Sequence, residues 1–201
     1  MSETIAVFGY GSLVTQATLP EGTVAIPGRL TGVRRAWKIA GETPIGRVCG
    51  LTALADDASS SRDVGVRGVL VSYPRALLPE LDKREWRYDR HALAPDAFMP
   101  DDGFSVDRSV ETIMYRVKPQ HERWGDDDHP IIQSYIDCVL RGFFERWGSA
   151  GVTHFIETTD GWHAPIARDR HQPRYRRTVR ITAEEEALFD AALERAGARW
   201  L

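Results

Sequence analysis

The stretch "VFGYGSL", residues 7–13, starts as an apolar strand and breaks at Gly-Tyr-Gly-Ser. The apolar run before the break, residues 5–8, is typical of a short buried β-strand. Gly9 and Gly11 both accept positive φ, so a sharp turn here can leave consecutive backbone N–H groups pointing outward. Such a turn suits an anion or a carbonyl oxygen, although most Gly-x-Gly turns only connect elements. A G-x-G-x-x-G nucleotide fingerprint is excluded, because position 14 is Val14.

Composition favours one folded domain with a small-molecule partner. The chain has 201 residues, 42% hydrophobic and 27% charged, so it can bury a core, and we expect one domain over residues 1–201. A formal net charge of -3 gives no electrostatic footprint for nucleic acid or a membrane surface. The first residues, with Glu3, lack the features of a signal peptide, and no apolar run approaches the length of a membrane span. We therefore expect a soluble, cytoplasmic protein.

The first half of the sequence reads as β structure, and the β-rich core is expected over about residues 4–117. Polar or Pro/Gly-rich loops are predicted at 55–63 and 95–103. Between them, a short helix is interrupted at Pro79 and resumes toward Glu85. A half-exposed strand or a hairpin is predicted at residues 29–39, and further strands are predicted at 48–54, 64–73, 86–93 and 106–117.

The second half, residues 130–201, is expected to hold helices and a basic crossing segment. Apolar residues at helical spacing predict an amphipathic helix over 130–147 that stops at Gly148, with Gly142 marking a close approach to another backbone. A second helix over 183–196 begins with a capping box. Its apolar face can pack within the chain or at a homodimer interface. That face consists of Leu188, Phe189, Leu193 and the nearby Trp200.

A second candidate motif is "LDKREWRYDR", residues 81–90. Its alternating charges are typical of a solvated surface, where Glu85 would pair with Arg84 or Arg87. However, the apolar bulk of Trp86 next to it could desolvate the Glu85 carboxyl and raise its pKa.

Together the two motifs resemble the γ-glutamylcyclotransferase-like superfamily, including its bacterial ChaC-like branch. Members carry "YGSL" or "YGSN" after the first strand and later "D-x-R-E-x-x-Y-x-R"; here these are residues 10–13 and 82–90. Similar segments occur in the family's order at 30–37, 66–74 and 129–142, so the resemblance spans about residues 5–147. It implies an α+β fold, a small mixed or antiparallel β-barrel flanked by helices, here with a C-terminal helical extension.

The resemblance also implies an activity and its residues. The activity is cleavage of a γ-glutamyl amide to 5-oxoproline and a free amine, with Glu85 as general base and then general acid. No cofactor or metal is implied. The expected substrate-binding residues are Tyr10, Gly11, Ser12, Leu13, Tyr88 and Tyr135.

This reaction suits the residue types present. The α-amine of a γ-glutamyl group can attack its own γ-carbonyl, so cyclisation needs no water, and one carboxylate can move both protons. The N–H groups of the turn suit either the oxyanion of the intermediate or the substrate α-carboxylate. The sequence leaves both open. Tyr10 and Ser12 are expected to add hydroxyls.

Several alternatives stay open. The same fold can serve as a non-catalytic binding or sensor module, or act on a larger γ-glutamylated metabolite. Trp86 and Arg87 would narrow the pocket and put glutathione in doubt, and Arg168 or Arg174 of the basic segment could meet a substrate carboxylate.

A metal site is a further alternative. Its candidate ligands are Asp126, Asp127, Asp128 and His129, with His154, His163 and His171, but their spacing matches no metal-binding motif. The cysteines, Cys49 and Cys138, indicate neither a disulfide framework nor a zinc site, and Cys138 is expected to be buried.

Overall fold

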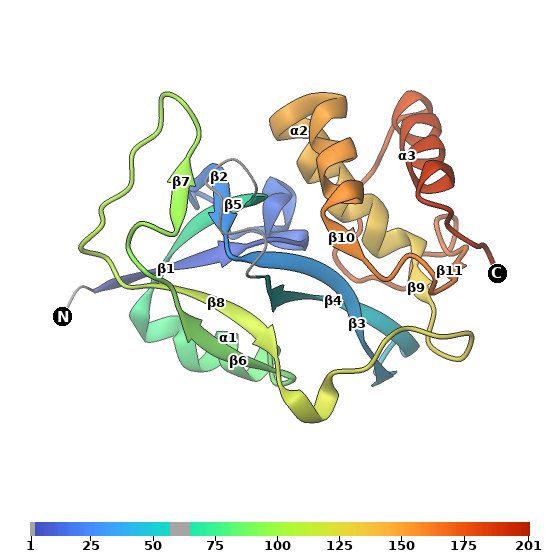
Figure 1. Cartoon of the computed structure of the whole chain (residues 1–201), viewed down its shortest axis with the longest axis horizontal. Helices are drawn as coiled ribbons and strands as arrows, with labels where there is room; N and C mark the ends of the chain where they lie inside the picture. Colours follow the sequence, from blue (N-terminus) through green and yellow to red (C-terminus); the bar gives the residue numbers. More distant parts are fainter. Residues whose placement is uncertain (1–2, 57–64) are drawn as a thin grey trace.

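The protein has an α+β architecture, as predicted, in a computed structural model that describes residues 3–56 and 65–201. Most of the strands occupy one side of the molecule, and helices α2 (Gln133–Glu157) and α3 (Ala183–Arg195) lie side by side on the other, next to the short strands β9 (Ile131–Ile132), β10 (Thr159–Asp160) and β11 (Ile166–Ala167) (Figure 1). Helix α1 (Leu78–Arg84) lies close to strands β6 (Tyr88–Ala92) and β8 (Thr112–Val117). No helix in the described part of the chain is long and apolar enough to cross a membrane.

The main sheet has six strands in the order β6-β8-β1-β5-β2-β7. Strand β1 is near its centre and is parallel to β8, whereas the other neighbours are antiparallel. Five consecutive residues of β1 are buried, as expected for a strand covered on both faces. The strands are β1 (Thr4–Gly9), β2 (Ala25–Thr31), β5 (Gly65–Pro74), β6 (Tyr88–Ala92), β7 (Phe98–Pro100) and β8 (Thr112–Val117).

A smaller sheet, in the order β10-β3-β4, meets the main one where β4 lies against β8. There the Val117 N–H donates to Thr52 Oγ1 at 3.0 Å and the Arg116 guanidinium donates to the Ala53 carbonyl at 3.3 Å. The described strands thus form separate sheets joined by side chains, and they include a short parallel pair, β9 with β11. The remaining strands are β3 (Val33–Thr43), β4 (Gly46–Ala55), β9 (Ile131–Ile132), β10 (Thr159–Asp160) and β11 (Ile166–Ala167).

Several predicted boundaries were wrong in the β-rich half. The segment 29–39, expected as a strand or a hairpin, is the end of β2 and the start of β3, which belong to different sheets because Gly32, with φ 75°, turns the chain between them. The strand expected at 106–117 begins only at β8, and the loop expected at 95–103 contains β7, which hydrogen-bonds to β2. Most of the loop predicted at 55–63 lies outside the described residues.

The predicted helices are present, but the ends of some of them differ from the prediction. Pro79 does not interrupt α1, because it lies in the first turn, where no N–H partner is lost. Helix α2 starts later than expected, since β9 pairs with β11 just before it, and it continues past a break at Gly148 (φ 61°, ψ -154°). The capping box of α3 is confirmed: the Thr182 hydroxyl accepts from the Glu185 N–H.

Gly142 brings α2 against the turn that follows β1. A Cβ atom added at Gly142 would lie 2.4 Å from Thr15 Oγ1 and 2.6 Å from Thr15 N, which confirms the predicted close approach to a backbone. The Thr15 hydroxyl donates to the Cys138 carbonyl at 2.5 Å, one helical turn before Gly142. The short 3₁₀ helix Ser12–Val14 is therefore held directly on α2.

A buried arginine joins β3 to the end of α2. Arg35 is fully buried, and its guanidinium lies 5.1 Å and 4.9 Å from the ring centroids of Phe143 and Phe155. It donates hydrogen bonds to Thr159 Oγ1 at 3.1 Å and to the Arg67 carbonyl at 2.8 Å. The cation is thus held by aromatic faces and neutral oxygens.

His154, close to this arginine, makes stability depend on pH. Its Nε2 accepts a hydrogen bond from the Arg67 N–H at 2.9 Å, so the folded protein needs the neutral ring. Burial, with the charges of Arg35 and Arg67, lowers the pKa of His154 to about 3, from 6.5. Because the unfolded chain binds this proton more readily, its stabilising contribution is lost as pH falls from about 6.5 toward 3, at up to about 1.4 kcal/mol per pH unit.

We therefore expect His154→Gln, which keeps an acceptor but cannot titrate, to flatten this dependence. Urea unfolding between pH 7 and 4 would show a smaller loss of stability in the variant than in the wild type. His171→Gln, at an exposed histidine, is the matched control and should follow the wild type. Parallel curves for wild type and His154→Gln would contradict the prediction.

Candidate active site

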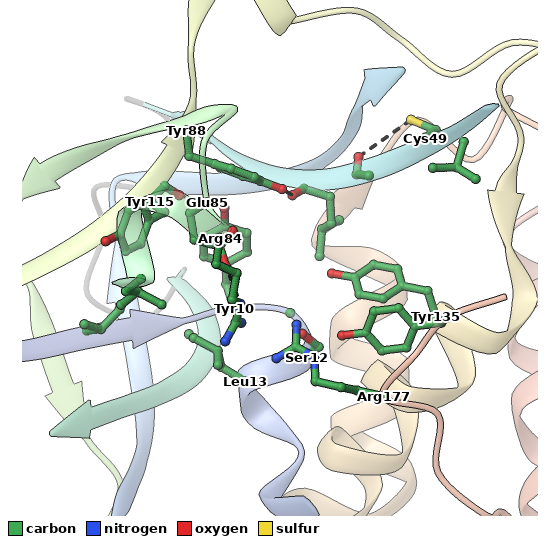
Figure 2. A pocket seen from close by; sticks show the side chains of 18 of the residues that line it. Tyr10, Ser12, Leu13, Cys49, Arg84, Glu85, Tyr88, Tyr115, Tyr135 and Arg177 are labelled. Atoms are coloured by element: carbon green, nitrogen blue, oxygen red, sulfur yellow. Dashed lines mark hydrogen bonds and ion pairs between the residues drawn. The ribbon is translucent and has the colours of Figure 1, made fainter. Parts of the chain in front are cut away.

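A cavity of about 240 Å³ opens beside the end of β1 and contains every residue expected at the site. It is slightly smaller than the roughly 300–1,000 Å³ of drug-sized ligand pockets, so it suits a small metabolite. The charged residues in its lining are Arg84, Glu85 and Arg177, and most of the rest is aromatic or aliphatic (Figure 2). The predicted residues that line it are Tyr10, Gly11, Ser12, Leu13, Glu85, Tyr88 and Tyr135.

Glu85 is directed into the cavity by the apolar face of α1. Leu78 and Leu81 are buried, and Glu85 follows them at helical spacing, three and then four residues on. Glu85 caps the helix: its N–H donates to the Leu81 carbonyl, and its own carbonyl accepts from the Tyr88 N–H at 2.8 Å. The same turn therefore places Glu85 and Tyr88 in the cavity wall.

The environment of Glu85 raises its pKa. Burial is the largest cause, and the Glu85 side chain is only 21% exposed. The Arg84 Nε atom, 2.9 Å from Glu85 Oε1, and the more distant Arg177 act in the opposite direction. A carboxyl whose pKa is raised toward neutrality is suited to accept a proton and return it.

Trp86 does not bury Glu85, contrary to the expectation from sequence. Its side chain is 54% exposed and packs edge-on against His121, with ring centroids 5.1 Å apart. Arg87 turns away as well and donates to the Glu42 carbonyl. Neither residue lines the cavity, so the predicted narrowing was wrong. Strand β6 begins only at Tyr88, which leaves the two residues before it in an exposed turn.

Two other residues of the second motif fasten α1 to the sheet. Asp82 Oδ1 accepts from the Tyr115 hydroxyl at 2.8 Å and lies 3.3 Å from Arg90 Nε. Tyr115 is on β8 and Arg90 on β6, where the two residues are paired. This triangle holds the helix end that carries Glu85.

The glycines at the turn of residues 10–13 are explained by close packing, which leaves no space for a Cβ atom. Neither Gly9 nor Gly11 has positive φ, so that part of the prediction was wrong. A Cβ at Gly11 would lie 2.9 Å from Tyr135 Oη, and one at Gly9 would lie 2.6 Å from Leu13 Cβ. Within residues 3–56 and 65–201, the N–H groups of residues 11–13 have no hydrogen-bond acceptor. These three donors beside the cavity can bind an anion.

The predicted tyrosines contribute their rings to the cavity wall rather than free hydroxyl groups to a ligand. Tyr10 Oη donates to the Tyr115 carbonyl at 2.7 Å and Tyr88 Oη donates to the Leu51 carbonyl at 3.0 Å, so both hydroxyl protons are engaged. The Tyr135 ring packs edge-on against Tyr175, with centroids 5.0 Å apart. Burial raises the pKa of Tyr10, Tyr88 and Tyr135, which keeps their phenols neutral.

Sequence reasoning missed Tyr175 and Arg177, which enter the cavity from the basic crossing segment. The arginines considered instead lie elsewhere: the Arg168 guanidinium is 4.3 Å from the Trp200 ring centroid, and Arg174 Nε is 3.7 Å from Asp169. The spacing Tyr-x-Arg was a weak signal within a segment rich in arginine.

Cys49 also lines the cavity but is unsuited to be a nucleophile. Burial raises the pKa of its thiol to about 12, so no thiolate forms near neutral pH. Both Cys49 and Cys138 are buried free thiols.

Asp169 fastens the crossing segment to α2. The Ser134 N–H and hydroxyl donate to its carboxylate at 2.7 and 2.6 Å, and the Arg174 N–H donates to it at 3.0 Å. The Ser134 oxygen in turn accepts from the Tyr175 N–H at 3.2 Å. A buried carboxylate therefore fixes the path of the chain just before its cavity-lining residues.

Asp169→Asn should destabilise the protein by about 2–3 kcal/mol. The amide nitrogen of Asn would lie next to a hydrogen-bond donor of Ser134 or Arg174, which would leave that buried donor without an acceptor. The measurement is urea unfolding. Asp128→Asn, at an exposed position, removes the same charge and should change stability little. Equal stability of the two variants would contradict this role of Asp169.

The candidate metal ligands do not gather at one point. Asp126 accepts from the His129 N–H and lies 2.7 Å from its Nδ1, whereas Asp127 pairs with Arg199. His154 is engaged by the Arg67 N–H. Among residues 3–56 and 65–201, no group of three or more His, Cys, Asp or Glu side chains is placed to hold a metal ion.

Comparison with known proteins identifies the fold. No protein-family model and no curated protein sequence matches the chain. Among solved structures, it is similar to a human protein described as uncharacterized protein loc79017 (13% identity, TM-score 0.59) and to a protein described as gamma-glutamyl cyclotransferase (12% identity, TM-score 0.58). Each alignment covers 94% of this chain and 99% of the other.

A third similar structure is YkqA from Bacillus subtilis, with 18% identity and a TM-score of 0.53 over 80% of this chain and 57% of the other. The chain thus has the fold of a γ-glutamyl cyclotransferase, which confirms the resemblance at the level of fold.

Proposed function

We propose that this chain cleaves a γ-glutamyl amide to 5-oxoproline and a free amine, with Glu85 as general base and then general acid. The observation that carries the proposal is one partly buried carboxyl of raised pKa in the same small cavity as the free N–H donors of residues 11–13. The fold, shared with a protein described as gamma-glutamyl cyclotransferase, supports the same reaction class.

The reaction follows from the substrate's own geometry. The α-amine attacks the γ-carbonyl carbon, and the new C–N bond closes the five-membered ring of 5-oxoproline. A cavity that holds the glutamyl chain folded supplies an effective molarity of up to about 10⁵ M or more. Because the nucleophile belongs to the substrate, the chain needs no nucleophile of its own, which agrees with the protonated state of Cys49.

One carboxylate can handle the protons of both steps. Glu85 takes a proton from the attacking amine and delivers it to the departing nitrogen as the γ-amide C–N bond breaks. No water is consumed, because the attacking nitrogen belongs to the substrate itself.

The free N–H groups of residues 11–13 complete the site. When the γ-carbonyl oxygen becomes an oxyanion, preorganised backbone donors stabilise it more than they stabilise the neutral amide. The neutral phenols of Tyr88 and Tyr135 add no competing charge.

The test is 5-oxoproline release from a panel of glutathione, γ-glutamyl dipeptides and γ-glutamyl amines. Glutathione belongs in the panel, since Trp86 and Arg87 leave the cavity open. Release from any member supports the proposal, and the best member identifies the leaving amine. If none is cleaved while one of them protects the protein against heat, the chain is a binding module and the proposal fails.

A further inference from the structure

The cavity carries one positive charge more than its own residues neutralise. Arg84 is paired with Glu85 at 2.9 Å. Arg177 makes no ion pair within 4.0 Å with any described residue, although it lines the same cavity. Figure 2 shows the Arg84 and Arg177 side chains reaching toward the same region from opposite sides, with Ser12 nearby. An unpaired, half-buried guanidinium is a strong attractor for a carboxylate.

Arg177 is held in place rather than free to swing away. The guanidinium lies 5.6 Å from the Tyr175 ring centroid, and that ring packs on Tyr135. The chain just before it is anchored by Asp169 and Ser134, as described above. The cation is therefore presented by a fixed segment, which reduces the entropy lost on binding.

A second polar group beside it lacks a partner. Tyr175 Oη is buried and lines the cavity; the Ser12 side chain lies near enough to lower its pKa, but no hydrogen bond of normal geometry joins the phenol to a residue in the described parts of the chain. A buried hydroxyl without a partner is uncommon in native proteins, and a ligand oxygen would satisfy it. Arg177 and Tyr175 thus offer a cation and a donor from one segment.

We propose that Arg177, together with the Tyr175 hydroxyl, binds a carboxylate of the substrate. The inference rests on the proposed function for its choice of ligands, because a γ-glutamyl compound supplies the carboxylate in either of two places. One is the α-carboxylate of the glutamyl group, and the other is the carboxylate of the amino acid that leaves. Arg84 cannot replace Arg177 without giving up Glu85.

Binding is measured first in an Arg84→Gln, Glu85→Gln background, so that no ligand is consumed and an Arg84 guanidinium released from Glu85 cannot take the place of Arg177. The probes are γ-glutamylalanine, γ-glutamylethylamine, which lacks the leaving-group carboxylate, and γ-glutamylalanine with its α-carboxylate converted to a carboxamide. Adding Arg177→Gln should weaken binding of γ-glutamylalanine about 10- to 100-fold, as expected for a lost charged hydrogen bond. The matched control is Arg176→Gln, an exposed neighbour outside the cavity, which should bind like its parent.

The two analogues then identify the carboxylate. If Arg177 meets the leaving amino acid, γ-glutamylethylamine will bind equally with and without Arg177→Gln. If it meets the α-carboxylate, the carboxamide analogue will be the insensitive one. Equal affinities of the Arg177→Gln and Arg176→Gln proteins for all three probes would overturn the proposal. So would failure of every probe to bind the Arg84→Gln, Glu85→Gln parent.

Turnover separates this inference from the proposed function. With Glu85 intact, Arg177→Gln should raise KM far more than it lowers kcat, and it should shift the acidic limb of the pH profile upward. The shift follows because Arg177 lowers the pKa of Glu85. If the wild type releases no 5-oxoproline, the proposed function fails, while the binding comparison still decides the role of Arg177.

Discussion

In the Glu85→Gln variant, 5-oxoproline release is expected to fall by about 10²- to 10⁴-fold, the contribution typical of a general acid or base. The amide has almost the same shape, so it can occupy the same place at the end of α1. It can neither take the proton of the attacking amine nor protonate the leaving nitrogen. The loss should therefore appear in kcat.

The matched control is Glu80→Gln, an exposed glutamate on the same helix, which should retain wild-type activity. The pH profile gives an independent check. In the wild type, release should decline as pH falls through the raised pKa of Glu85, because the base becomes protonated. A Glu85→Gln enzyme that keeps a tenth of the activity would refute this assignment.

Gly142→Ala is expected to lower the free energy of unfolding by about 1–3 kcal/mol, as overpacked sites do. The sign is informative, because helix propensity alone favours Ala over Gly by about 1 kcal/mol. The added methyl would lie within 2.7 Å of three Thr15 atoms, two of them backbone, which cannot rotate away. Since Thr15 follows directly on the 3₁₀ helix that starts at Ser12, turnover should fall as well.

Urea unfolding and 5-oxoproline release measure the two effects. Thr153→Ala, an exposed substitution on the same helix, tests propensity alone and should be neutral or slightly stabilising. If Gly142→Ala is as stable as the wild type, α2 and the turn are less tightly packed than the structure indicates.

The predicted site residues come together because their positions are encoded locally. The turn of residues 10–13 directly follows a strand, and Glu85 follows two buried leucines at helical spacing. Such patterns fix the direction of a side chain relative to its own element. The resemblance added that the two segments face each other, and the common cavity agrees with it.

The missed features depend on contacts between distant residues. Arg177 lines the cavity because Asp169 accepts a hydrogen bond from Ser134, 35 residues earlier. No local sequence pattern predicts that hydrogen bond. Strand β7 forms because it pairs with the edge of β2 that β5 leaves unpaired. Trp86 faces outward because β6 starts two residues after it, a boundary set by pairing with β8. Tertiary context overrides propensity in each case.

The cavity draws on both ends of the chain, which has a consequence for biosynthesis. Leu13 and Arg177 line the same space but are roughly 160 residues apart. At translation rates of about 5–20 residues per second, roughly 8–30 s separate their emergence from the ribosome. The nascent protein can therefore fold its β-rich half while Arg177 is still absent. A complete cavity arises only when the segment that carries Arg177 docks, so the site matures after the β-rich half has formed.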